Sequence, residues 1–279
     1  MEAVQPRSFG IARCRAEAIA AFAFIERNFY LTKRYWGWEV AFVIYTLASS
    51  MSVIYIGKAQ GGQNSEQLIL YLGIGTLVWS YLNSVFSNIS EMISWERWEG
   101  TIEFTMMAPI SRLTHMLGVS LFAVIYGILR TALFLGALAI FFDINIAHAN
   151  LGGALLVILL GSLSFIGFGI MAAVLPLLFT ERGEQMTFII SSILLLVSGV
   201  YYPISVLPGW MQFMSHISPA TYVLTGMRST VLDGASTTSI FGSLWPMTLI
   251  GVVTIPLGMA VFISVERYAK RIGRLKRNG

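Results

Sequence analysis

The sequence predicts an all-α integral membrane protein. Its 279 residues are 56% hydrophobic and only 11% charged, and the mean hydropathy is +0.73, which is far from the composition of soluble domains. Six apolar stretches are candidates to cross a bilayer. Because no water inside a bilayer can satisfy an exposed backbone, each stretch is expected to be a helix.

The six candidate spans follow the apolar runs of the chain. They lie near 36–56, 68–89, 113–142, 151–179, 186–201 and 245–265. A helix of about 20 residues crosses the hydrocarbon core, so the third and fourth must tilt or extend beyond it. Together they form a membrane domain over 36–265, and the fifth is short for a span.

The segment between the fifth and sixth spans, 202–232, is half-apolar and repeatedly interrupted. Pro203, Pro208 and Pro219 recur within it. Because proline cannot continue a helix, this pattern predicts short broken helices. We expect this segment to be re-entrant, dipping into the outer leaflet without crossing it.

Basic residues indicate the orientation. If the N-terminus is inside, fifteen of the 18 lysine and arginine residues fall on the inner side, including a basic tail at 266–279. The positive-inside rule then places both termini in the cytoplasm, with the protein in the inner (plasma) membrane. Anionic lipid explains this charge, so the pI near 9.3 is no sign of nucleic-acid binding. Cys14 has no possible disulfide partner within the chain.

The segment before the first span, 1–35, has a helical period. Ala18, Phe22, Ile25 and Phe29 recur at steps of four, three and four. This spacing predicts an amphipathic helix at the inner membrane interface. A plain anchor and a helix with a further role both remain open.

Acidic and aromatic residues gather in the loop between the second and third spans, at 90–112. On a helix, apolar side chains spaced by three and four residues form one stripe, and acids with the same spacing run beside it. The stripe comprises Trp95, Trp98, Ile102 and Met106, and the acids are Glu96, Glu99 and Glu103. We expect Gly100 to bend this helix and Pro109 to end it.

An apolar stripe bordered by acids suits a protein partner with an apolar cleft and a basic rim. Lipid is a poorer partner, because anionic headgroups repel a row of carboxylates. The alternative is a solvated loop helix that packs on its own spans.

Two motifs carry a family resemblance. Glu99-Gly100-Thr101-Ile102-Glu103, followed by Ala108-Pro109-Ile110-Ser111-Arg112, resembles the cytoplasmic coupling segment of type 2 ATP-binding-cassette (ABC-2) exporter permeases. Residues 199–228 resemble the segment after the fifth span of the same family, with Tyr202-Pro203, Leu207-Pro208-Gly209-Trp210, Pro219-x-Thr221-Tyr222 and Arg228. Ala108 departs from the family, whose members often have threonine there.

The resemblance implies that the loop docks on a separate cytoplasmic ABC ATPase, and that the permease pairs with an identical or similar permease chain. ATP and Mg²⁺ would bind the ATPase, with no metal or other cofactor on this chain. The expected coupling residues are Trp95, Glu96, Trp98, Glu99, Gly100, Thr101, Ile102, Glu103, Pro109 and Arg112. The pathway or gate candidates are Arg130, Tyr202, Pro203, Pro208, Tyr222 and Arg228.

Independently of the family, the sequence contains no Gly-x-x-x-x-Gly-Lys-Ser/Thr phosphate loop; Gly57-Lys58 is followed by Ala59. ATP hydrolysis is therefore expected on another polypeptide. Arg130 lies inside the third predicted span, where a charge is costly and functional by default, unless it lies nearer an interface.

Other classes of membrane protein fit less well. An intramembrane enzyme needs grouped catalytic or metal-binding side chains, whereas His115, His148 and His216 are scattered. A channel needs a repeated polar face or a carbonyl filter. The resemblance therefore implies an exporter of an amphipathic substrate, either a drug or lipid-like molecule or, alternatively, a lipid-linked polysaccharide.

Overall fold

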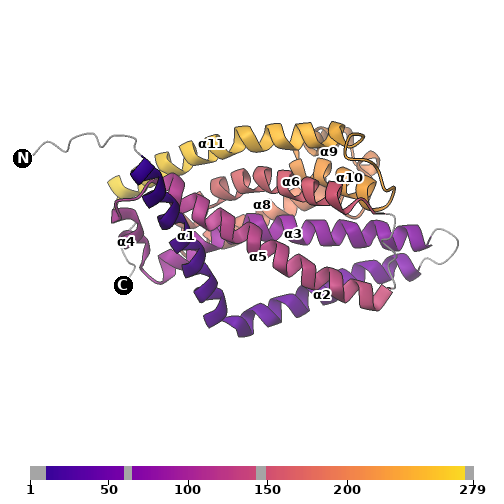
Figure 1. The fold of residues 1–279 in the computed structure, drawn as a ribbon, viewed down its shortest axis with the longest axis horizontal. Coiled ribbons are helices and arrows are strands. Elements are labelled where there is room, and N and C mark those ends of the chain that lie inside the picture. Colours follow the sequence, from indigo (N-terminus) through magenta and orange to yellow (C-terminus); the bar gives the residue numbers. More distant parts are fainter. Residues whose placement is uncertain (1–10, 60–64, 143–148, 274–279) are drawn as a thin grey trace, which may run out of the picture.

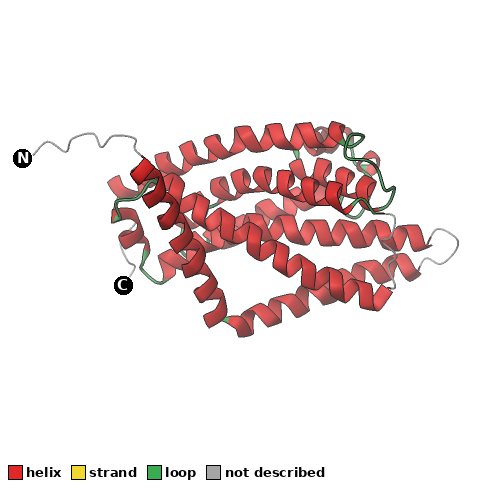
Figure 2. Ribbon diagram, in the orientation of Figure 1, coloured by secondary structure: helices red, strands yellow, loops and turns green. Residues whose placement is uncertain are grey.

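The computed structural model describes residues 11–59, 65–142 and 149–273. Arg7, His148 and the tail beyond residue 273 lie outside this part of the chain. All regular structure in the described ranges is helical, with no strand (Figure 2). The all-α prediction is confirmed.

Five long helices are apolar enough to cross a membrane, and they run side by side along the long axis of the molecule (Figure 1). They are α2 (Trp36–Ala59), α3 (Ser65–Trp98), α5 (Arg112–Phe142), α6 (Leu151–Ala172) extended by α7 (Val174–Leu178), and α11 (Phe241–Arg271). The fifth expected span, 186–201, corresponds to α8 (Gly183–Val197), which has only 15 residues. The count of full-length spans in the described chain is therefore five.

α1 (Ile11–Arg34) packs across one end of α5. The contact is close at Gly118, where an added Cβ would lie 2.7 Å from both the Ala21 carbonyl oxygen and Phe24 Cβ. Phe22 and Phe29 are exposed on the other side of α1. At Tyr35 the chain bends sharply, and α2 continues toward the opposite end of the molecule (Figure 1).

α6 and α11 pack along much of their length, and small residues make this possible. A Cβ on Gly167 would lie 2.2 Å from Thr254 Oγ1, and one on Gly251 would lie 2.9 Å from Leu163 Cβ. Ser164 Oγ also donates a hydrogen bond to the Met247 carbonyl oxygen at 2.5 Å. The glycines of the fourth span therefore serve helix packing.

Short helices follow α8: the 3₁₀ turn η1 (Ile204–Val206), α9 (Gly209–Ile217) and α10 (Pro219–Val231). Pro203 and Pro208 directly precede η1 and α9, and Pro219 is the first residue of α10. α9 and α10 lie at one end of the bundle. The start of α1, the end of α11 and the short helix α4 (Ile102–Met107) lie at the opposite end, which we call the α4 end (Figure 1).

Candidate functional site at the α4 end

α3 and α4 are separate helices, contrary to the single bent helix that the spacing predicted. Gly100 has φ 71°, its N–H donates to the Arg97 carbonyl oxygen at 3.3 Å, and the Thr101 N–H donates to the Glu96 carbonyl oxygen at 2.9 Å. These two bonds and the left-handed glycine form a Schellman cap, which ends α3. Glycine is favoured here because side chains destabilise this backbone conformation.

The break changes which side chains reach the surface. Ile102, Met106 and Glu96 are 1%, 6% and 3% exposed, so none of them is available to a partner. Trp95 is half-buried, and its ring lies 4.9 Å from the ring of Tyr35. The prediction of an exposed stripe containing Trp95, Ile102 and Met106, and of Glu96 as a surface contact, was wrong.

Another set of side chains is exposed instead. Trp98, Phe104 and Met107 are 71%, 71% and 72% exposed, and Glu99 and Glu103 are also exposed. We call these five residues the α4 face. Phe104 and Met107 were missed by the sequence reasoning, although their three-residue spacing within the new helix marks one side of it.

The loop between α7 and α8 is hydrogen-bonded to the end of α3, next to the α4 face. Trp98 Nε1 donates to the Thr180 carbonyl oxygen at 3.1 Å. Arg97 Nη2 donates to Thr180 Oγ1 at 2.5 Å. These two bonds therefore hold the α7–α8 loop against the end of α3.

The buried carboxylate of Glu96 joins three helices. Arg27 Nη2 of α1 lies 2.6 Å from Glu96 Oε1, and His115 Nε2 of α5 lies 3.0 Å from the same oxygen. The His115 ring is fully buried and lies 4.7 Å from the ring of Phe24. Sequence reasoning missed this cluster because its members come from distant parts of the chain.

Arg112 connects α4 to α11. Its Nε donates to both carboxylate oxygens of Glu266 at 3.0 Å, and its Nη1 and Nη2 donate to the carbonyl oxygens of Thr105 and Met106 at 3.2 and 2.5 Å. The guanidinium thus satisfies carbonyls at the end of α4, which have no partner within that helix. Lys270 Nζ lies 2.6 Å from Glu266 Oε1.

The link from α4 to α5 passes through the exposed Pro109. Ser111 then caps α5, because its Oγ accepts a hydrogen bond from the Thr114 N–H at 3.0 Å. The Ser111 N–H itself donates to Glu17 Oε2 of α1 at 3.3 Å. Among the described residues, no group of three or more His, Cys, Asp or Glu side chains could hold a metal ion.

Comparison with known proteins decides the family. The model of the ABC-2 type transporter family matches residues 20–232, which is more than half of the chain. The chain belongs to the ABC-2 type transporter family. It is a transport permease of that family, with several membrane-spanning helices.

Curated relatives of this ABC-2 permease are distant. The inner membrane transport permease YadH of Escherichia coli strain K12 is 24% identical over 177 residues, covering 62% of this chain and 66% of YadH. The probable multidrug ABC transporter permease YbhR of the same strain is 23% identical over 180 residues, covering 60% of this chain and 45% of YbhR. The match thus spans just under two thirds of YadH and less than half of YbhR.

The expected gate residues of this ABC-2 permease are not at the α4 end. Arg228 Nη1 and Nη2 donate to the carbonyl oxygens of Gly199 and Val200 at 3.1 and 2.7 Å, and its guanidinium lies 3.5 Å from the Tyr71 ring centroid. Arg228 therefore holds the turn after α8 against α3.

Two tyrosines make similar hydrogen bonds in the segment 202–232. Tyr202 Oη donates to the Leu196 carbonyl oxygen at 2.6 Å, and Tyr222 Oη donates to the His216 carbonyl oxygen at 2.8 Å. Arg130 lies elsewhere: its Nη2 donates to Thr46 Oγ1 of α2 at 3.1 Å. These bonds hold the turn after α8 to α8, α10 to α9, and α5 to α2.

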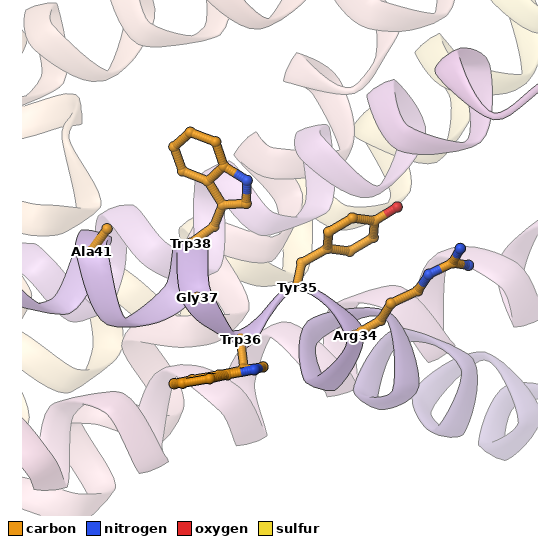
Figure 3. A pocket seen from close by; sticks show the side chains of 6 residues that line it. All are labelled: Arg34, Tyr35, Trp36, Gly37, Trp38 and Ala41. Carbon is orange, nitrogen blue, oxygen red and sulfur yellow. The ribbon is translucent and has the colours of Figure 1, made fainter.

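A hollow of about 460 Å³ lies where α1 turns into α2. It is lined by Arg34, Tyr35, Trp36, Gly37, Trp38 and Ala41 (Figure 3). The indole rings of Trp36 and Trp38 point to opposite sides of the first turn of α2 (Figure 3), and both are 68% exposed. Exposed indoles are typical of side chains at a membrane interface.

Proposed function

We propose that this chain is the permease subunit of an ATP-driven ABC exporter in the inner (plasma) membrane. It pairs with a second permease subunit and docks on a cytoplasmic ATPase that binds ATP and Mg²⁺. It moves an amphipathic drug or lipid-like substrate outward by alternating access. The observation that carries the proposal is the α4 face, with its exposed apolar side chains and two carboxylates.

The composition of the α4 face suits a protein partner. Trp98, Phe104 and Met107 offer apolar side chains that a cleft can bury. Glu99 and Glu103 are exposed beside them, so a cleft with a basic rim would fix the register of binding. Anionic headgroups would instead repel these carboxylates.

The contacts behind the α4 face can transmit movement of the ATPase. Arg112 joins α4 to α11 through Glu266. Glu96 joins α3 to α1 and α5 through Arg27 and His115. Displacement of α4 would therefore move these helices together, which is the kind of packed two-state element that coupling needs.

The other helices of the chain are consistent with the six-span arrangement of the proposed exporter. α8 and the short helices up to Val231 complete a six-span arrangement in which the outer segment re-enters the membrane. The α4 end and both termini then lie in the cytoplasm, with the exposed stripe of α1 at the inner interface. The name of YbhR, a probable multidrug permease, favours a drug-like substrate.

The experiment is copurification of the cognate ATPase subunit with permease variants in detergent. We expect the charge-reversed pair Glu99→Lys with Glu103→Lys to weaken ATPase association at least about tenfold. Truncation of Phe104 and Met107 to alanine should have a similar effect.

The matched control is Asp233→Lys, an exposed acid after α10 at the opposite end of the bundle. This variant should bind the ATPase as the unmodified chain does. Unchanged association of both α4-face variants, with the permease still inserted, would refute the proposal.

A further inference from the structure

A row of polar side chains runs along the second half of α3. Ser80, Asn83, Ser87 and Glu91 are spaced by three, four and four residues, which places them on one face of the helix. Polar side chains are costly in hydrocarbon, so such a row faces the protein interior or a water-filled space. Glu91 is the only carboxylate in this row, and it is half-buried.

Hydrogen bonds fix how α8 lies against this row. Ser191 Oγ donates to Asn83 Oδ1, and the hydroxyls of Thr187 and Ser90 lie 2.9 Å apart. Because α3 and α8 run in opposite directions, the next turn brings Glu184 of α8 toward Glu91. The two carboxylates interact electrostatically.

A third carboxylate approaches from α2. The contact between the rings of Tyr35 and Trp95, 4.9 Å between centroids, sets the register. Glu39 lies four residues after Tyr35, and Glu91 lies four residues before Trp95, so the two acids come level with each other and interact electrostatically. Glu39 also accepts a hydrogen bond from Tyr126 Oη.

Positive charge is in deficit around Glu91. Arg130 is the cation that acts on it, and the guanidinium of Arg130 donates to Thr46 Oγ1. In ranges 11–59, 65–142 and 149–273, no ion pair engages Glu39, Glu91 or Glu184, and no hydrogen bond engages the Glu91 carboxylate. Three acids with one nearby cation leave an excess of negative charge, so an occupant with positive charge would stabilise this arrangement.

A second, independent feature lies on the same face. Ser87, one turn from Glu91, is 7% exposed, and its Oγ has no hydrogen-bond partner among the described residues. Buried hydroxyls normally have a partner. An unpaired hydroxyl next to an unpaired carboxylate marks a place where a ligand can bind.

The nature of the occupant follows from the spacing of the acids. No group of three carboxylates in the described chain is close enough to chelate a metal ion, which favours a larger cation with delocalised or shielded charge. The position of Glu184 in the first turn of α8 has its own explanation, since an acid there interacts favourably with the helix dipole. No such explanation applies to Glu91, which lies seven residues before the end of α3.

We propose that Glu91, supported by Glu184 and Glu39, recognises an organic cation with an apolar body between α2, α3 and α8. This inference rests on the proposed export function and specifies its substrate class. The charge of the cation is neutralised by the carboxylates, and its apolar part lies among the surrounding side chains. A polyanionic substrate would be repelled from the same place.

The test measures equilibrium binding of tetraphenylphosphonium to the purified full-length permease in lipid nanodiscs. Tetraphenylborate, which has the same shape and opposite charge, is the matched ligand. We expect the cation to bind, and Glu91→Gln and Glu184→Gln each to weaken its binding about tenfold, since one lost charge contact is worth about 1.4 kcal/mol. Glu91→Asp keeps the charge and should retain most of the affinity.

The matched control variant is Glu181→Gln, an exposed acid three residues from Glu184, which should bind the cation as tightly as the unmodified chain. The inference is overturned if tetraphenylphosphonium does not bind or if tetraphenylborate binds equally well. It is also overturned if Glu91→Gln leaves cation binding unchanged, which is the result expected if the Glu91 carboxyl is protonated and uncharged. The assay contains no ATPase. If the cation does not bind but the unmodified permease copurifies with the ATPase, only the cation site is refuted. If the unmodified permease does not associate with the ATPase, the proposed function is refuted.

Discussion

Arg112 Nε lies 3.0 Å from both carboxylate oxygens of Glu266. This contact joins the first residue of α5 to the last two turns of α11, while the same guanidinium binds carbonyl oxygens at the end of α4. Arginine offers several donors in one plane, so one side chain can hold three helices at once. The α4 face is therefore attached to the last span as well as to its sequence neighbours.

Arg112→Lys should separate docking from coupling. Lysine keeps the charge but cannot reproduce the donor geometry, so we expect normal ATPase association and a fall in ATP-driven transport of about tenfold. Transport into inverted vesicles and ATPase copurification measure the two properties. Arg182→Lys, at an exposed arginine, is the control, and wild-type transport by Arg112→Lys would contradict the coupling role.

Glu96→Ala should destabilise the permease strongly. The substitution leaves Arg27 and the buried His115 without their shared partner. Removing one member of a buried charged cluster costs about 3 kcal/mol, at the low end of the range because Arg27 is partly exposed. Thermal unfolding in detergent measures the change. Glu99→Ala, at an exposed position, should change stability by less than about 0.5 kcal/mol, and equal effects of the two substitutions would contradict the assignment.

Gly100→Ala should impair the α4 face more than Gly100→Asn. The φ of 71° costs an ordinary L-residue about 1–2 kcal/mol, whereas asparagine tolerates this conformation better. We expect the alanine variant to lose stability and ATPase association, and the asparagine variant to retain most of both. Binding and thermal unfolding of the two variants give the comparison. If they behave alike, the left-handed cap is not what positions α4.

Much of the fold could be predicted because membrane spans are encoded locally. Length and apolarity are enough to find α2 and α11, and the family follows from short motifs such as Glu99-Gly100-Thr101. Proline positions indicated where the short helices of segment 202–232 begin. Six spans were expected, but α8 is too short to cross a membrane alone, so the described chain has five full-length spans.

The surface of the coupling segment could not be predicted in the same way. The predicted stripe assumed one helix that continues through Gly100. The Schellman cap at Gly100 ends α3 instead, and in the new helix α4 Ile102 is buried and Phe104 is exposed. Glu96 is buried because Arg27 and His115 come to it from other helices. No periodicity within 90–112 contains that information, since it depends on tertiary packing.

The sidedness of the α4 face tests the account most directly. In a Cys14→Ser background, a single cysteine at Glu103 or at Ser205, both exposed and at opposite ends of the bundle, is treated in intact cells with a membrane-impermeant maleimide. We predict that Ser205→Cys is labelled and that Glu103→Cys is labelled only after the membrane is opened. Labelling of Glu103→Cys in intact cells would place the α4 face outside, where no ATPase could reach it.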